Sequence, residues 1–447
     1  MSEALYFLTG LDANAEVKGS RDPLGIQPIW TALGRRFVAH LTTVTTSFRG
    51  FSVLLLGLEL AERSLASRRV GDHEARERER LACFLRFEQI AAYARYVTHQ
   101  ATDIRGINRV KRRLQEDSTV TIGHADRHQI LAEQRTYGLW GLYTSAARGS
   151  GLVEEADVRP TPATRDQIEA VYLNELGKGF VADLVKRVGD EGKKFDPRGR
   201  DQALAAKLGD MLGPARRANE QHLMNAALVE VNDACDTTHG KQRELWRAID
   251  ARSGSKGFAW GASSTLEDIV AYRAALPAGS ELADDLDRVI AVEPLLATME
   301  AIFNHVVGRR SVKRPDLLDS MAKEWRAGAF RHLRPDAVER CAEPLAQAAG
   351  ADAPARFAAA LKALRDDDFG EALDQILAQN DAVMRARGGA GWLDHRGGEL
   401  RARLFQHPVK LPTRESLPTL WRNSYFIDAV RWIGADIRGD LGVSDAG

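Results

Sequence analysis

The chain has 447 residues, of which 44% are hydrophobic and 28% are charged. These proportions are ordinary for globular proteins, so disorder is excluded for most of a chain that is long enough for two to four domains. Its 62 basic and 62 acidic side chains cancel, which excludes a protein that binds polyanions over its whole surface. Residues 1–150 hold 21 Lys and Arg against 16 Asp and Glu, so we expect any nucleic-acid contact in this first third.

Residue usage also indicates the fold class and the compartment. Ala, Leu, Arg and Glu dominate, a bias that favours helix, and we expect a mainly α, multi-domain protein. Its three cysteines are far apart and form no CxxC pair, as is typical of a reducing cytoplasm. The N-terminus lacks a signal-peptide pattern, and the longest apolar run, residues 51–61, is too short to cross a bilayer. We expect a soluble cytoplasmic protein that makes no membrane contact.

The first region of interest in chain order has a hydroxyl-rich run at residues 42–47. Apolar residues from Phe37 to Phe48 and again from Leu54 to Ala61 fall near helical spacing and predict two helices that meet near Arg49–Gly50. Hydroxyl side chains compete for backbone hydrogen bonds, so the run is unusual within a helix. One interpretation is a Thr-rich turn that caps the following helix. The other is a surface that contacts phosphates together with Arg35, Arg36 and Arg49.

The densest basic cluster lies between Ile104 and Leu114. Ile107, Val110 and Leu114 stand at helical spacing, so the basic residues share the opposite side of a predicted helix. Such a face can bind a nucleic-acid backbone by releasing its counterions. Alternatively, the charges pair with acidic residues at the end of the helix. The basic residues are Arg105, Arg109, Lys111, Arg112 and Arg113.

The stretch from Tyr137 to Tyr172 is predicted to contain a helix, a glycine stop, a short strand at Leu152–Val153, an acidic loop and a new helix. This order resembles the second half of a winged-helix domain, and we also expect a helix at Asp126–Thr136 before it. The resemblance implies that Thr144, Ser145 and Arg148 face outward towards a DNA groove. The loop at 154–162 contains a single basic residue, so a wing that packs on protein is an open alternative.

No catalytic motif is evident. The chain contains no nucleophile elbow, kinase set, P-loop or dinucleotide fingerprint, and we expect no cofactor and no metal. His124 and His128 stand at i,i+4 with Asp126 between them, which leaves a metal-dependent nuclease as a third alternative. The sequence favours a protein without catalytic residues of its own.

The remainder of the chain is expected to be helical up to about residue 390. A β-hairpin is predicted around Arg396-Gly397-Gly398, followed by an aromatic helix from Leu420 onward. The predicted domains are an N-terminal helical domain with a basic surface (1–117), a winged-helix-like module (118–176), a helical domain (177–390), and the hairpin with the terminal helix (391–447).

Two segments resemble uncharacterised bacterial proteins that are associated with phage-defence gene clusters. They are DPLGIQPIWTALGRRFVAHLTTVTTSFRGF near the start and NDAVMRARGGAGWL with LPTLWRNSYFIDAVRWI near the end. The resemblance implies work on DNA beside helicase and nuclease subunits. We therefore expect a non-catalytic adaptor that binds nucleic acid, with DNA as the expected form, and recruits other protein subunits. The alternative is a scaffold that binds only protein.

Overall fold

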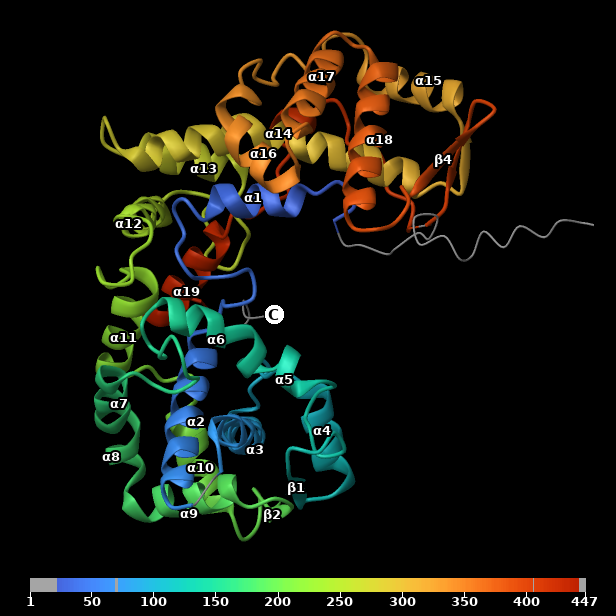
Figure 1. Cartoon of the computed structure of the whole chain (residues 1–447). Helices are drawn as coiled ribbons and strands as arrows, with labels where there is room; N and C mark the ends of the chain where they lie inside the picture. The colour runs from blue at the N-terminus through green and yellow to red at the C-terminus, as the bar shows by residue number, and fades with distance from the viewer. Residues whose placement is uncertain (1–21, 69–70, 405, 442–447) are drawn as a thin grey trace, which may run out of the picture. The chain divides into compact units, whose positions relative to one another are not determined.

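The computed structural model describes residues 22–68, 71–404 and 406–441, and these residues are mainly helical with two small antiparallel sheets (Figure 1). They form two compact units. Unit 1 contains the described residues up to Phe37 together with Ser264–Tyr425, and unit 2 contains Val38–Ser263 together with the described residues from Phe426. The helical fold class is confirmed. Each of the two units joins segments that are distant in the sequence. The division into four contiguous domains stays a prediction.

Unit 2 is built on α2 and α3, which pack along each other and are buried over most of their length. Asp72 caps α3 by accepting a hydrogen bond from the Ala75 amide at 2.9 Å, so the charged run at 73–80 begins the helix as a partly exposed entry. α9 packs on both helices, and α10 packs on α3. The helices of unit 2 are α2 (Phe48–Ala66), α3 (His73–His99), α4 (Ile107–Glu116), α5 (Gln134–Tyr137), α6 (Leu139–Gly149), α7 (Pro162–Ile168), α8 (Asn174–Leu176), α9 (Lys178–Gly189), α10 (Gln202–Met211), α11 (Ala218–Met224), α12 (Lys241–Ser253) and α19 (Ile427–Arg438), with π-helical turns η2 (Glu169–Leu173) and η3 (Asn225–Val229).

The sheet of unit 2 pairs β1 (Val120–Ile122) with β2 (Lys193–Phe195), and Thr121 lies opposite Lys194. β1 follows α4 closely in the chain, so this pairing brings β2 into the part of unit 2 that also contains α4 (Figure 1). The ladder therefore joins two short segments that are more than 70 residues apart.

Unit 1 surrounds α14, a 27-residue helix that is almost entirely buried. Among the described residues, α14 is the one helix long and apolar enough to cross a membrane by length and composition, and 83% of its apolar window is buried inside the structure. That burial is typical of the core helix of a folded unit. The helices of unit 1 are α1 (Ile26–Gly34), α13 (Leu266–Ala274), α14 (Glu281–Val307), α15 (Arg314–Trp325), α16 (Ala342–Ala349), α17 (Ala353–Arg365) and α18 (Phe369–Ala386), with 3-10 turns η4 (Glu339–Cys341) and η5 (Leu417–Thr419).

The predicted hairpin is present in unit 1 as β4 (Leu393–Arg396) and β5 (Glu399–Ala402). Gly397 and Gly398 both have positive φ, at 58° and 80°, which a two-residue hairpin turn of this kind requires. β3 (Ser311–Lys313) adds to the free edge of β5, so the sheet order is β3-β5-β4.

Three predicted helical stretches are wrong, and in each case side chains bind the backbone that a helix would use. Residues 35–47 are irregular, because the Thr45 hydroxyl accepts a hydrogen bond from the Thr42 amide at 2.7 Å and donates to its carbonyl. Within 126–136 only the segment from Gln134 is helical, since the Gln134 side chain accepts a hydrogen bond from the Ile130 amide. Residues 420–426 are not helical either.

Glu293 explains that last difference. Its buried carboxylate accepts hydrogen bonds from the amides of Arg422 and Asn423 at 2.8 and 3.0 Å, from the Asn423 side chain at 3.0 Å and from the Tyr425 hydroxyl at 2.6 Å. Burial raises the pKa of Glu293 to about 7, despite these donors. The turn at 421–423 thus anchors the end of unit 1 on α14, and the terminal helix begins only at Ile427.

Candidate nucleic-acid interface

α4 carries the basic cluster, and its amphipathic pattern is confirmed. Val110 and Leu114 are buried, while the cationic side chains lie on the other sides of the helix. Gly106 precedes α4 with φ 82°, and a Cβ atom there would lie 2.3 Å from the Ile130 carbonyl oxygen. The glycine therefore lets the loop at 124–133 pack directly on the start of α4.

Two arginines of α4 hold this loop through carbonyl oxygens. Arg109 Nη1 donates to the Gln129 carbonyl at 2.9 Å. Arg113 donates to the carbonyls of His128 and Arg127 at 2.5 and 2.7 Å. A carbonyl oxygen carries only a partial charge, so both guanidinium groups keep their net positive charge.

The other cations of the cluster are less constrained. Arg105 is exposed, and Lys111 Nζ lies 5.9 Å from the centre of the Tyr96 ring. Arg112 pairs with Glu116 at 3.8 Å, in an i,i+4 contact. Of the ion pairs expected between this cluster and acidic residues at the end of the helix, this is the one observed among the described residues, and it is long and exposed. In the part of the chain that the structure describes, no carboxylate lies within ion-pair distance of Arg105, Arg109, Lys111 or Arg113.

Neighbouring segments add further cations to the α4 surface. The pKa of His128 is lowered, first by burial and then by the charges of Arg127, Arg113 and Lys194, with Glu191 acting in the opposite direction. The Glu191 carboxylate is bound by Arg86 at 2.9 Å and by His124 Nδ1 at 2.7 Å. Although burial raises its pKa, these hydrogen bonds lower it to about 2, so its charge is retained and matched. We define the α4 basic surface as Arg105, Arg109, Lys111, Arg112, Arg113, Arg127 and Lys194.

The predicted site residues near the start of the chain have other surroundings. Arg35 is half-buried in unit 1, and Arg36 Nε binds Asp285 at 2.5 Å in the same unit. Arg49 is 4% exposed and binds the buried Glu220 at 2.5 Å. The Arg49 side chain is therefore unavailable to a phosphate in this structure. The hydroxyl-rich run forms a turn, as one of the two interpretations expected. It does not cap α2, because the Phe48 amide donates to Asp436 at 2.8 Å and not to a hydroxyl.

The residues predicted to face a DNA groove from α6 are also dispersed. Thr144 is buried, and its hydroxyl donates a hydrogen bond to the Trp140 carbonyl at 2.5 Å. The prediction that Thr144 faces outward is therefore wrong. Ser145 is exposed and Arg148 is half-buried. Downstream, Val153 and Pro160 form a single β-bridge, and Thr161 caps α7. A helix, a bridge and a helix are present in this order, and the winged-helix module is not confirmed.

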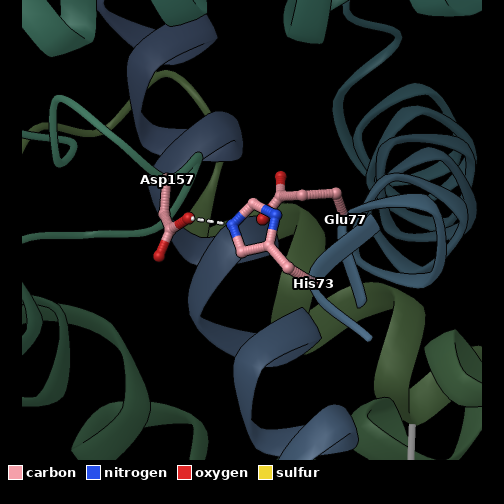
Figure 2. A group of neighbouring side chains, drawn as sticks. All are labelled: His73, Glu77 and Asp157. Carbon is pink, nitrogen blue, oxygen red and sulfur yellow. Dashed lines mark hydrogen bonds and ion pairs between the residues drawn. The ribbon is translucent and has the colours of Figure 1, made fainter. Parts of the chain in front are cut away.

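One group of described residues has the geometry of a cation site. His73 and Glu77 on the first turns of α3 meet Asp157 from the loop before α7, with all three ligand atoms within 4.8 Å of one another (Figure 2). His73 Nε2 bonds to Asp157 at 2.9 Å, and Arg80 pairs with Glu77. Arg159 lies 3.5 Å from Asp157. Arg80 also pairs with Glu62 and Arg159 also pairs with Glu154, so the group belongs to a larger ion-pair network in which each arginine is shared between two carboxylates.

The three residues of the nuclease alternative have separate partners. His124 binds Glu191, the His128 ring accepts from Arg127 Nε at 3.0 Å, and Asp126 accepts from Gln129 at 3.1 Å. They lie in turns and not on one helix face. The i,i+4 spacing therefore does not bring their ligand atoms together.

Sequence reasoning missed the contributions of Arg127 and Lys194 to the α4 basic surface. Lys194 lies in a short KKF segment whose pairing with VTI is too brief for a periodicity signal. A local excess of basic residues at 193–200 was the available indication. No family model, no curated protein and no solved structure matches this chain.

Proposed function

We propose that this protein is a non-catalytic, nucleic-acid-binding adaptor that contacts the phosphate backbone, with DNA as the expected form, through the α4 basic surface. The observation that carries the proposal is the chemistry of the partners on α4. Arg109 and Arg113 are fixed by carbonyl oxygens, so their orientation is set while their charge stays available. A pre-oriented cation loses less side-chain entropy when it binds a phosphate.

The charge pattern fits backbone contact better than base readout. Phosphate contacts fix orientation without sequence information, whereas base readout needs an element that enters a groove. Arg109 and Arg113 hold the loop at 124–133, so these two side chains are committed to the face of α4 that the loop covers. We therefore expect binding with little sequence preference and a strong dependence on salt.

We propose that residues 137–172, which have a winged-helix-like order of elements, contact a protein partner. Glu154, Glu155 and Asp157 lie in its loop and disfavour a phosphate there, although Arg159 binds Glu154 at 2.6 Å. The resemblance of both chain ends to proteins of phage-defence gene clusters supports helicase or nuclease subunits as partners and the bacterial cytoplasm as the compartment.

The test is a titration of a labelled DNA duplex at several salt concentrations. We compare the protein with a triple variant, Lys111→Gln, Arg112→Gln and Arg127→Gln, which leaves the arginines that hold the loop intact. Each phosphate contact contributes about 1 to the slope of log affinity against log salt, so the variant slope should fall by about 2 to 3.

A matched control removes three cations that are exposed and paired with carboxylates elsewhere: Arg78, Lys362 and Arg396, each changed to Gln. Its net charge equals that of the test variant, and its slope should stay within experimental error of the parent protein. Equal slopes for both triple variants, or no binding by the parent, would refute the proposal. Loss of a co-purifying subunit without any change in duplex binding would favour the protein-only scaffold.

A further inference from the structure

Unit 2 contains a cavity of about 580 Å³ at the N-terminal end of α2. Thr46, Ser47, Thr102 and Arg105 provide polar groups, and Trp432 provides an aromatic ring. The volume is in the range of small-molecule sites. A recess of about 40 Å³ adjoins it, since Ser47, Arg105 and Tyr143 line both spaces.

Within the part of the chain that the structure describes, two hydrogen-bond donors of the lining have no acceptor. The Tyr143 hydroxyl, on a side chain that is 3% exposed, accepts from the Ser47 amide at 3.4 Å, yet its own hydrogen has no acceptor among the described residues. Burial raises the pKa of Tyr143 to about 12, so this hydrogen is present at neutral pH. The buried Nε1–H of Trp432 also has no acceptor there. Buried donors are nearly always paired, and the Tyr143 hydroxyl lies at Ser47 where the cavity and the recess meet, so it indicates an acceptor supplied from outside the chain.

The acidic groups of the lining are already matched by cations or by backbone amides. Asp103 accepts two hydrogen bonds from Arg95, both at 2.7 Å. Asp436 accepts from Arg216 at 2.6 Å and from the Phe48 amide at 2.8 Å.

Glu88, in the recess, accepts from Gln134 Nε2 at 2.6 Å and from the Leu139 amide at 2.8 Å. Burial raises its pKa to about 7, so a large fraction of this carboxyl is neutral at physiological pH.

Arg105 is the cation of the lining that no carboxylate pairs in the described part of the chain. Ser47, the N-cap residue of the 19-residue helix α2, lies in the same lining, where the Phe48 amide is already bound by Asp436. Hydroxyl groups of Thr46 and Thr102 complete a lining rich in donors. The local field therefore favours an anion with several acceptor oxygens.

We propose that this cavity binds the phosphate group of a nucleotide-sized phosphate monoester, with Arg105 and the Tyr143 hydroxyl as its principal donors. A phosphate alone would leave most of the volume empty. The Trp432 ring offers a face on which a base can stack. The phosphate can belong to a free nucleotide or to the 5′ end of a nucleic acid, and the chemistry of recognition is the same.

The test is isothermal titration of the full chain with adenosine 5′-monophosphate, adenosine and inorganic phosphate, followed by oligonucleotides with and without a 5′-phosphate. We expect the monophosphate to bind at least about tenfold more tightly than adenosine, because hydrogen bonds to a charged group are strong. Tighter binding of the monophosphate than of either oligonucleotide identifies a free nucleotide. Preference for the 5′-phosphorylated oligonucleotide over its 5′-hydroxyl form identifies a strand end.

The variants separate this proposal from the proposed function. Arg105→Gln should weaken binding of the phosphate by about tenfold, and Tyr143→Phe by about threefold to tenfold. Tyr143→Phe keeps the ring that packs on Phe51 and leaves the surface charge unchanged, so the salt dependence of duplex binding should stay as in the parent.

Arg112→Gln is the control, because Arg112 lies on α4 outside the cavity lining. Equal affinity for phosphorylated and unphosphorylated ligands, no detectable binding of either, or equal effects of Arg105→Gln and Arg112→Gln would overturn the proposal.

Discussion

The start of α2 and the helix α4 both supply arginines that the sequence predicts as phosphate contacts, and the structure treats them in opposite ways. Arg49 is buried against the carboxylate of Glu220, whose same oxygen also accepts from Ser52 at 2.8 Å and from Tyr172 at 2.6 Å. Arg113 on α4 is held by carbonyl oxygens. The difference lies in the formal charge of the partner.

This difference decides what each arginine can do. A carboxylate neutralises the charge of a guanidinium group. When both groups are buried, loss of either one leaves an uncompensated charge and strongly destabilises the fold. A carbonyl oxygen orients the guanidinium group without cancelling its charge. An arginine of the first kind contributes to stability, and one of the second kind can also attract an anion. We therefore expect substitution of Arg49 to change stability and not nucleic-acid affinity, and substitution of the α4 cations to change nucleic-acid affinity.

The largest effect is expected at Arg49. Arg49→Met leaves Glu220 buried without its cation, which should lower the free energy of unfolding by about 3–5 kcal/mol. Chemical denaturation followed by circular dichroism measures the change. Affinity for the duplex should be unaffected under conditions where the variant is folded.

The double variant Arg49→Met with Glu220→Met is the control for this prediction. It removes both charges, so it should recover much of the lost stability. A single variant as stable as the parent would mean that the buried pair has no structural role.

The second effect concerns Glu88, which lies between the two regions in the sequence. Burial raises its pKa from 4.5 to about 7 in the folded state, so between these pH values the folded state binds more protons than the unfolded state. This contribution to stability is full below about pH 4.5 and is lost as the pH rises through about 7. The difference corresponds to about 3 kcal/mol.

Glu88→Gln cannot deprotonate, so its stability should fall less than that of the parent between pH 5 and pH 8. Denaturation midpoints at a series of pH values measure both slopes. Parallel curves for parent and variant would contradict a raised pKa at this position.

A smaller effect is expected at Arg113, where both roles meet. Arg113→Ala removes the hydrogen bonds to the His128 and Arg127 carbonyls and should cost about 1–2 kcal/mol of stability. It should also lower the salt slope of duplex binding by about 1. Arg113→Lys keeps the charge but not the paired geometry, so it should restore the slope more fully than the stability. A variant that changes stability alone would assign Arg113 to the structural class of Arg49.

The smallest stability change is expected at Arg112, whose single carboxylate contact is long and exposed. Arg112→Gln should alter the free energy of unfolding by no more than about 0.5 kcal/mol. It should nevertheless weaken duplex binding by a similar factor for different sequences. Thermal unfolding and titrations with two unrelated duplexes measure these quantities, and a strong sequence-dependent loss would indicate base contact instead.

The helical class and the hairpin could be predicted because their signals are local. Helical spacing around Val110 and Leu114 and the Gly397-Gly398 turn are each contained in a few residues. The three wrong helices failed because the competing partner is distant or is a side chain. The backbone of 422–423 binds Glu293, which is about 130 residues away and carries no local indication of that role.

For the candidate site, the sequence identified the cations between Arg105 and Arg113 but not Arg127 or Lys194, and it could not assign the partners of any of them. Arg49 and Arg113 are equivalent in composition and in predicted helical context, and only tertiary structure distinguishes Glu220 from a loop carbonyl. Lys194 joins the α4 basic surface through a three-residue ladder with β1. The cavity lining combines residues from 46 to 441, so no spacing rule could have found it.

The attachment of α19 has a consequence for the order in which the chain can fold during synthesis. Unit 2 is interrupted by Ser264–Tyr425, and α19 returns to it only afterwards. There Asp436 caps α2 and binds Arg216, while Gly434 sits against the Trp246 ring. Residues 427–438 must therefore leave the ribosome before unit 2 can close, and until then its incomplete core exposes apolar surface to chaperones and proteases. Truncation before α19 should give an aggregation-prone product even though most of unit 2 has been made.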